Sequence, residues 1–331
     1  PNNSNMKKST LIIAVVALAT VCSITAQDKK KTGPTTWKEK AAARFGDTPT
    51  KAHKTEIKAN IPTPTAKPKA ARKVLVFFRC ETFIHTSIPF CNFAMQAIEK
   101  QTGAFSVDLA DEYEVFTSEN LAQYDAIIFN NTTSLDPNEE QRAAILEFVN
   151  GGKGIVGFHA AADNFKDWPE GIALMGGIFN GHPWTGGGTW AFKLDDTDHP
   201  LNAAFKGKGF WHKDEIYRYK DESFQGREKL RVLLSLDMTK VENQKPIGSE
   251  KFKKDYADPS KVDLPVSWCR EVGKGRLFYT NLGHNDMTFA NKTVLLHMLD
   301  GIQFALGDLE ADTVPSTEAN AKLVHAPDAA E

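Results

Sequence analysis

The chain has 331 residues, of which 41% are hydrophobic and 25% are charged, and its formal net charge at pH 7 is -2. These values are ordinary for a globular protein that is long enough to bury a substantial core. They argue against a nucleic-acid partner, because such proteins usually concentrate basic residues on one face.

Residues 1–26 are interpreted as upstream residues followed by an export signal. Two lysines precede an apolar stretch from Leu11 to Val21, and small residues follow up to a cleavage position after Ala26. The stretch is shorter than the about 20 residues needed to cross a bilayer. We therefore expect a protein exported to the periplasm or the extracellular space, without integral membrane association; a lipid anchor at Cys22 is the weaker alternative.

Composition divides the rest of the chain into three parts. Residues 27–71 are rich in Lys, Thr, Pro and Ala and predict a largely disordered linker, with a short helix from Trp37 to Phe45. Residues 72–307 predict the ordered domain, and residues 308–331 a mobile C-terminal tail.

The ordered domain begins with alternating strands and helices. Short apolar runs predict strands, and apolar residues at helical spacing predict helices. In chain order, these are strand 74–78, helix 88–102, strands 105–109 and 124–129, helix 136–150 and strand 154–158. Such alternation predicts an α/β fold with a mostly parallel sheet that is covered by helices on both faces. Further strands are expected at 190–194 and 230–236, then a hairpin of 266–270 with 276–280, and a closing helix at 292–306.

A histidine directly follows the strand predicted at 154–158. In open α/β sheets the carboxyl ends of the strands line the ligand crevice. His159 is therefore expected to face a pocket as the central base or metal ligand, with Asp163 close behind it to orient or protonate.

Three more histidines stand beside glycine, proline or small polar residues, namely His85, His182 and His284. If they converge on His159, three or more histidines with one carboxylate suit a divalent transition metal, with Zn²⁺ favoured, and His85, His159, His182 and His284 are the predicted metal ligands. A metal-free arrangement, in which histidine–carboxylate pairs transfer protons, remains open. No nucleotide cofactor is expected.

Two neighbouring acids, Asp214 and Glu215, precede a possible short strand. Because successive strand residues point to opposite faces, one acid is expected in the pocket and the other in solvent. We favour Glu215 as the acid in the pocket. The predicted catalytic set is thus His159, Asp163, Glu215 and His284.

Substrate contacts are expected from polar and aromatic residues around these positions. Asn131 follows the strand at 124–129 and can donate hydrogen bonds to hydroxyls, and Trp184 can stack on a sugar ring. The predicted substrate-binding set is His85, Ser87, Asn131, His182 and Trp184.

Three cysteines follow the expected cleavage position: Cys80, Cys91 and Cys269. An exported protein allows a disulfide, and a Cys80–Cys91 bridge is conceivable. Small buried thiols are the favoured alternative.

Five segments in order resemble the ThuA-like (trehalose-utilisation) family of the class I glutamine-amidotransferase-like superfold. They are 83–89 (FIHTSIP), 157–163 (GFHAAAD), 176–183 (GGIFNGHP), 214–217 (DEIY) and Gly283-His284. The resemblance covers roughly residues 72–306. It implies a flavodoxin-like doubly wound sheet and a role in carbohydrate, especially disaccharide, catabolism.

The resemblance also sharpens the expected chemistry. In glutamine amidotransferases the turn after the equivalent strand carries a nucleophilic cysteine, but here it carries His159, so glutaminase activity is not expected. We predict an exported sugar isomerase, lyase or hydrolase that acts on a disaccharide or keto-sugar derivative by acid–base chemistry, with or without a metal. The alternative is a non-catalytic carbohydrate-binding accessory protein. In both cases the expected partner is a small-molecule carbohydrate.

Overall fold

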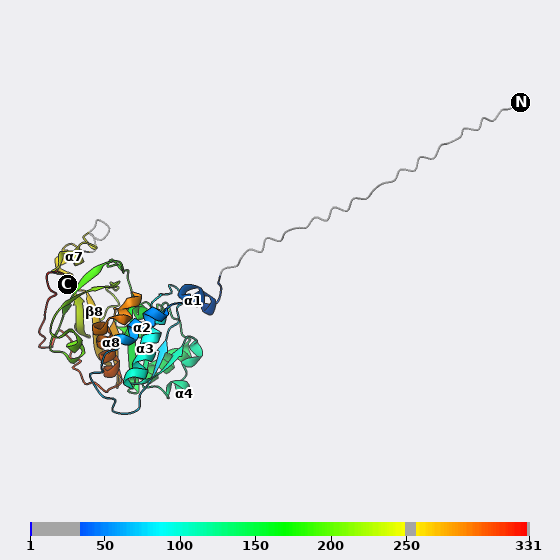
Figure 1. Ribbon diagram of the computed structural model, residues 1–331, viewed down its shortest axis with the longest axis horizontal. Coiled ribbons are helices and arrows are strands. Elements are labelled where there is room, and N and C mark those ends of the chain that lie inside the picture. Colours follow the sequence, from blue (N-terminus) through cyan, green and yellow to red (C-terminus); the bar gives the residue numbers. More distant parts are fainter. Residues whose placement is uncertain (2–33, 249–255, 330–331) are drawn as a thin grey trace. The chain divides into compact units, whose positions relative to one another are not determined.

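The computed structural model describes residue 1 and residues 34–248 and 256–329 (Figure 1). Within these residues a single sheet of nine strands has the order β2-β1-β3-β4-β9-β8-β7-β5-β6. The first five strands in this order are parallel: β1 (Lys73–Phe77), β2 (Ser106–Ala110), β3 (Ala126–Asn130), β4 (Gly154–Phe158) and β9 (Gly275–Thr280). The other four extend the sheet with antiparallel pairs: β5 (Thr189–Leu194), β6 (Phe210–Lys213), β7 (Arg231–Leu236) and β8 (Pro265–Val272).

The sheet is therefore mixed, which corrects the expectation of a mostly parallel one. The change of direction begins at the predicted hairpin, where β8 ends at Val272 and β9 starts at Gly275. A connection this short joins only antiparallel neighbours, since a parallel crossover needs a dozen or more residues. The sequence pattern missed β6, a strand of four residues at the sheet edge.

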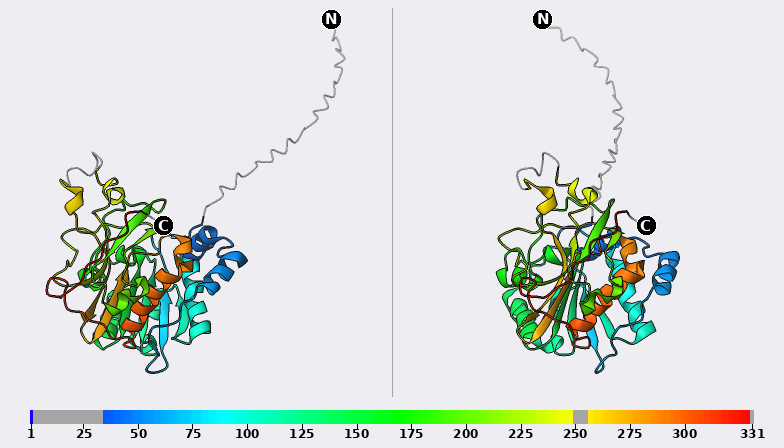
Figure 2. Two further views of the ribbon diagram at one scale, coloured as in Figure 1. Left: turned by 60° about the vertical axis from the view of Figure 1, so that its left-hand side comes forward. Right: turned by 90° about the vertical axis from the view of Figure 1, so that its left-hand side faces the viewer.

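Helices cover both faces of the parallel half, as Figure 2 shows. Val74 and Val76 pack with α3 (Ile88–Thr102) and α8 (Lys292–Ala305) in one buried cluster. Leu75 and Phe77 belong to a second cluster with α5 (Glu139–Asn150) and α6 (Pro169–Met175). Consecutive residues of β1 thus alternate between the two cores, as side chains of a strand must. The remaining short elements are α4 (Ser118–Leu121), α7 (Val241–Gln244), η1 (Tyr113–Val115), η2 (His159–Ala162), η3 (Pro200–Phe205), η4 (Pro259–Lys261) and η5 (Asp286–Ala290).

Residues 34–71 differ from the disordered linker that composition predicts. They contain the expected helix α1 (Trp37–Phe45) and a second helix, α2 (Lys51–Ala59), and each begins with a capping box. Ile57 is fully buried in the same cluster as α3 and α8. The capping residues satisfy the first free N–H groups of each helix, and Ile57 supplies apolar burial that compensates for ordering a polar segment.

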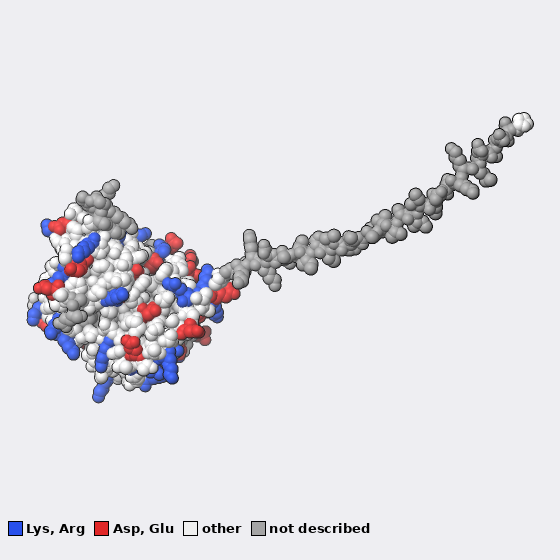
Figure 3. Space-filling model, turned by 45° about the horizontal axis from the view of Figure 1, so that its top comes forward, with Lys and Arg blue, Asp and Glu red and all other residues white. Residues whose placement is uncertain are grey.

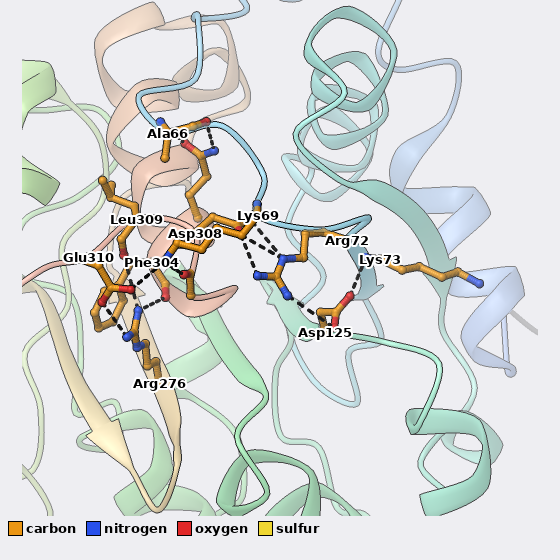
Figure 4. A network of polar contacts seen from close by, with 12 residues as sticks. Ala66, Lys69, Arg72, Lys73, Asp125, Arg276, Phe304, Asp308, Leu309 and Glu310 are labelled. Atoms are coloured by element: carbon orange, nitrogen blue, oxygen red, sulfur yellow. Dashed lines mark hydrogen bonds and ion pairs between the residues drawn. The ribbon is translucent and has the colours of Figure 1, made fainter.

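The C-terminal segment is also held in place, whereas the sequence predicts a mobile tail from residue 308. Figure 4 shows Arg72 paired with Asp308 at 2.7 Å and Arg276 paired with Glu310 at 2.8 Å. Further along, Val324 pairs with Leu194 as an isolated bridge beside the sheet. Ion pairs of this kind leave no apolar pattern in the sequence, so the tail could not be recognised as ordered.

Cys80, Cys91 and Cys269 are buried and free of disulfides. Burial raises the pKa of the Cys91 thiol well above its usual value, so the thiol stays neutral. Cys91 packs in the main apolar cluster, whereas the Cys80 thiol also donates to the carbonyl of Asn131 at 3.3 Å.

The expected export signal lies outside the described residues. Among the described helices, none has the length and apolar character needed to cross a bilayer. On the face in Figure 3, basic and acidic side chains are interspersed.

Candidate active site

His159 begins η2 directly after β4, at the carboxyl end of the parallel half of the sheet. Its φ of 44° lies in the left-handed region, which costs a non-glycine residue on the order of 1–3 kcal/mol. The side chain is fully buried, and its Nδ1 lies 2.7 Å from the carbonyl oxygen of Asn281. Because a carbonyl only accepts, Nδ1 carries the hydrogen, and the lone pair of Nε2 faces the site.

His284, from the loop after β9, meets this lone pair. Its Nδ1 lies 3.2 Å from His159 Nε2 and 3.2 Å from Glu215 Oε1. Glu215 Oε1 is in turn 3.7 Å from His159 Nε2. Three groups from distant parts of the chain therefore form a triangle of electron-pair donors that needs a shared cation, either a proton or a metal ion.

Glu215 links this triangle, of which it is one corner, to the more exposed His182. Its second oxygen, Oε2, is 3.1 Å from His182 Nδ1. Burial favours the neutral acid, but the neighbouring His159 and His284 outweigh it and hold the pKa of Glu215 well below its usual value. Burial likewise opposes the charge on His284, yet the hydrogen bond to Glu215 prevails and raises the pKa of His284.

His85 completes the group from the loop after β1. Its side chain is buried, and Nδ1 has no hydrogen-bond partner in the described structure. Burial, then the neighbouring His159 and His284, lower the pKa of His85 well below its usual value, so the ring is neutral and has a free lone pair. One ligand atom from each of His85, His159, Glu215 and His284 lies within 4.8 Å of all the others.

The predicted metal set of four histidines is thus changed in one member. Glu215 takes the fourth place, and His182 lies outside the group, with 49% of its side chain exposed. The ring of His182 stacks on Phe179, with 6.0 Å between centroids. His182 connects the buried cluster with solvent.

Asp214 is fully buried, which corrects the expectation that the neighbour of Glu215 faces solvent. Its carboxylate accepts hydrogen bonds from the backbone N–H groups of Gly283 at 2.7 Å and Asn285 at 2.9 Å. Gly283 has φ 127°, a value that L side chains rarely adopt. Asp214 therefore holds the turn that presents His284 beside Glu215.

Two other predicted site residues, Asp163 and Ser87, make contacts outside the group of four. The carboxylate of Asp163 pairs with Lys166 at 3.3 Å, and burial raises its pKa. Ser87 Oγ donates to the carbonyl of Gly283 at 2.8 Å, so it supports the His284 loop from inside. Neither side chain belongs to the group of four.

Asn131 and Trp184 do not present the surfaces expected for sugar contacts. The Asn131 amide is fully buried and donates to Asn130 Oδ1 at 3.0 Å. Trp184 is also fully buried, and its Nε1 donates to the carbonyl of Asn243 at 2.8 Å. Trp184 is a core residue, because the segment carrying it turns inward and pairs with Ile216.

Sequence reasoning missed Asn281 and Tyr217. Asn281 fixes the tautomer of His159 through its carbonyl and accepts from the backbone N–H of Tyr217 through Oδ1 at 2.8 Å. The Tyr217 ring lies 4.3 Å from that of His159. Asn281 directly follows β9, and this position at a strand end was the available signal.

A cavity of about 470 Å³ opens beside the group of four. His284 is the member of the group of four that lines it, together with Thr86, Gly186, Lys213 and Asn285. This volume is within the range of small-molecule sites in proteins.

Comparison with known proteins agrees with this architecture. Residues 73–305 match the family model described as trehalose utilisation (ThuA). A ThuA-like protein from Bacteroides uniformis ATCC 8492 is 24% identical over 77% of this chain and 99% of that one, with a TM-score of 0.55. A ThuA-like protein from Parabacteroides merdae ATCC 43184 is 18% identical over 76% and 100%, with a TM-score of 0.53. No curated protein matches the chain.

The two solved structures share the fold, and the family model adds the sequence relationship. The match spans the strands that carry His85, His159 and His284, together with the segment of Glu215. Family membership indicates a carbohydrate-related role. The chain belongs to the trehalose-utilisation (ThuA) family.

Proposed function

We propose that this protein is an exported enzyme that acts on a disaccharide or a keto-sugar derivative, and that its acid–base chemistry is assisted by a divalent transition metal, with Zn²⁺ favoured. The observation that carries the proposal is the group of four, His85, His159, Glu215 and His284. Family membership supports the carbohydrate substrate, and the sequence of residues 6–26 alone supports export.

The spacing of the donor atoms fits a metal. Zinc–nitrogen and zinc–oxygen bonds of about 2.0–2.1 Å at tetrahedral angles place neighbouring ligand atoms about 3.4 Å apart. The contacts among His159 Nε2, His284 Nδ1 and Glu215 Oε1 measure 3.2, 3.2 and 3.7 Å. The unpartnered Nδ1 of His85 supplies a further lone pair. The hydrogen bond from His159 to Asn281 is the outer contact that orients metal-bound histidines.

The four residues would hold the ion, which in such a site polarises a carbonyl oxygen or lowers the pKa of bound water. Glu215 and His182 have a separate role. Glu215 Oε2 lies 3.1 Å from His182 Nδ1, so Glu215 holds the half-exposed His182 ring where it can carry protons between the site and solvent. This arrangement suits isomerisation, elimination or hydrolysis next to a sugar carbonyl.

Metal analysis of the purified full-length protein, combined with a panel of keto-disaccharides followed by NMR, tests the proposal. We expect about one tightly held divalent ion per chain and turnover of at least one keto-disaccharide. His159→Gln should abolish both metal binding and turnover, because it removes the Nε2 lone pair that the hydrogen bond to Asn281 directs into the site. His182→Gln should keep the metal and slow turnover.

The matched control is His53→Gln, in the first turn of α2 and outside the group of four, which should change neither metal content nor rate, since glutamine also completes a capping box. A protein with no metal and no turnover would refute the proposal. Equal metal content in His159→Gln and the unmodified protein would show that His159 does not hold the metal, and would exclude the metal from the proposed mechanism.

A further inference from the structure

A second cavity lies at the far edge of the sheet, where β6 is the last strand. It has a volume of about 590 Å³ and lies between residues 207–213 and the C-terminal segment 324–327. Trp211 and Phe210 contribute aromatic rings to its wall, and Lys208 and Lys213 contribute charge. The proposed reaction assigns no role to these side chains, and Lys213 is shared with the smaller cavity.

Two lysines line this cavity, and the Asp237 carboxylate behind its C-terminal wall is bound to His325 and Ala326. Its lining residues include no aspartate or glutamate. Lys208 and Lys213 are exposed at its rim, and neither forms an ion pair with the described residues. Two free ammonium groups at one cavity favour an anionic ligand.

The C-terminal wall is a built feature. The buried Asp237 carboxylate accepts from the Ala326 backbone N–H at 2.8 Å and lies 3.1 Å from His325 Nδ1. Trp211 Nε1 donates to the carbonyl of Pro327 at 2.9 Å. With its N–H engaged in this way, the indole presents an apolar ring to the cavity, and apolar rings of this kind pack on sugar faces.

The two cavities adjoin each other. His212 and Lys213 line both, and the smaller cavity reaches His284. His212 is fixed between them, with Nε2 3.1 Å from Thr288 Oγ1. A ligand of two sugar rings can therefore extend from the group of four along β6 to Trp211.

We propose that the larger cavity is a subsite for an acidic sugar unit, whose anionic group lies between Lys208 and Lys213 while its ring packs on Trp211. This inference rests on the proposed function: when the acidic unit occupies the larger cavity, the other unit of the substrate lies beside the catalytic group. The substrate class becomes a disaccharide or keto-sugar derivative with one negatively charged ring.

Isothermal titration of the full-length protein with glucuronate, glucose 6-phosphate and glucose tests the subsite. Glucuronate should bind roughly tenfold or more tightly than glucose, because charge-assisted hydrogen bonds are the stronger kind. Lys208→Met/Lys213→Met should abolish that preference. Lys274→Met, in the β8–β9 turn near the middle of the strand order and outside the lining of the cavity, should leave it unchanged. Added salt should weaken only the acidic ligand.

The outcomes separate this subsite from the catalytic proposal. If glucose 6-phosphate binds tightly and glucuronate does not, the subsite still takes an acidic sugar unit, and its charged group is a phosphate ester. Equal affinity for glucose and both acids, or an unchanged preference in the double lysine variant, would overturn the subsite. If the protein lacks metal and turnover but retains the lysine-dependent preference, the proposed reaction fails while the subsite stands.

Discussion

Asp214 Oδ2 accepts a hydrogen bond from the backbone N–H of Gly283 at 2.7 Å, and this contact joins the strand end carrying Glu215 to the loop carrying His284. The same carboxylate accepts from Asn285 N–H and from Thr288 Oγ1. A single buried acid thus fixes the relative position of two members of the group of four.

We predict that Asp214→Asn weakens metal binding by roughly 10–100-fold, the usual effect of losing an outer contact to a metal ligand. The amide keeps one acceptor but turns N–H donors toward the backbone N–H groups of the loop. Zinc affinity measured by competition with a chromophoric chelator checks this. Asp286→Asn is the control, because Asp286 lies in the same loop but accepts its hydrogen bond from Thr86 Oγ1. Equal affinity in the Asp214 and Asp286 variants would contradict a positioning role.

The left-handed backbone of His159 gives a second prediction. His159→Gly and His159→Ala should both be inactive, since neither supplies an imidazole. The glycine variant should nevertheless unfold with a free energy higher by about 1 kcal/mol than the alanine variant, because glycine adopts φ 44° without strain. Urea denaturation of the two variants measures the difference. At a position with ordinary negative φ the alanine variant is the more stable of the two. A more stable alanine variant would therefore disprove strain in the backbone of His159.

Stability should depend on pH through Asp300, on α8. Burial raises the pKa of Asp300 to about 7, and Thr65 offsets this only partly. The folded state therefore holds a proton that the unfolded chain releases near pH 4. Stability from this group is complete below that pH and is lost as the pH rises through about 7.

Asp300→Asn keeps the neutral form at every pH and isolates this effect. We expect the variant to gain stability over the unmodified protein by a few kcal/mol, on the order given by the pKa shift, at pH 8 but not at pH 4. Urea denaturation at both pH values measures the change. An equal difference at both would show that Asp300 does not titrate in this range.

Helix α2 should contribute to global stability. Ile57→Ala removes a fully buried side chain from the main cluster and should cost about 2–5 kcal/mol of unfolding free energy. Glu56→Ala, at an exposed position of the same helix, should change it by less than about 0.5 kcal/mol. A loss of under about 0.5 kcal/mol for Ile57→Ala would mean that the helix contributes no core packing.

Apolar periodicity identified the elements that build the core. The helix predicted at 88–102 matches α3 at both ends, and the hairpin predicted at 266–280 is formed by β8 and β9. The same reasoning missed α2, since only Ile57 among its residues is buried and one apolar contact leaves no period.

The site was predictable in its members but only partly in their geometry. His85, His159 and His284 each follow a strand of the parallel half, and topology alone brings such positions together. Glu215 lies in the pocket as expected, whereas His182 lies outside the group, because it stands in irregular chain, where side-chain direction depends on long-range contacts. The prediction that Trp184 contacts a sugar was wrong, because an indole can pack in a core as well as it can stack on a sugar ring.

The pairing of Arg72 with Asp308 and of Arg276 with Glu310 bears on how this protein should be trimmed for laboratory use. The matched region, residues 73–305, cuts through that network on both sides and leaves Arg276 without its carboxylate. It also removes α2 and the wall at 324–327. Expression boundaries drawn from the family match would therefore yield a weakened scaffold with one of its two cavities opened.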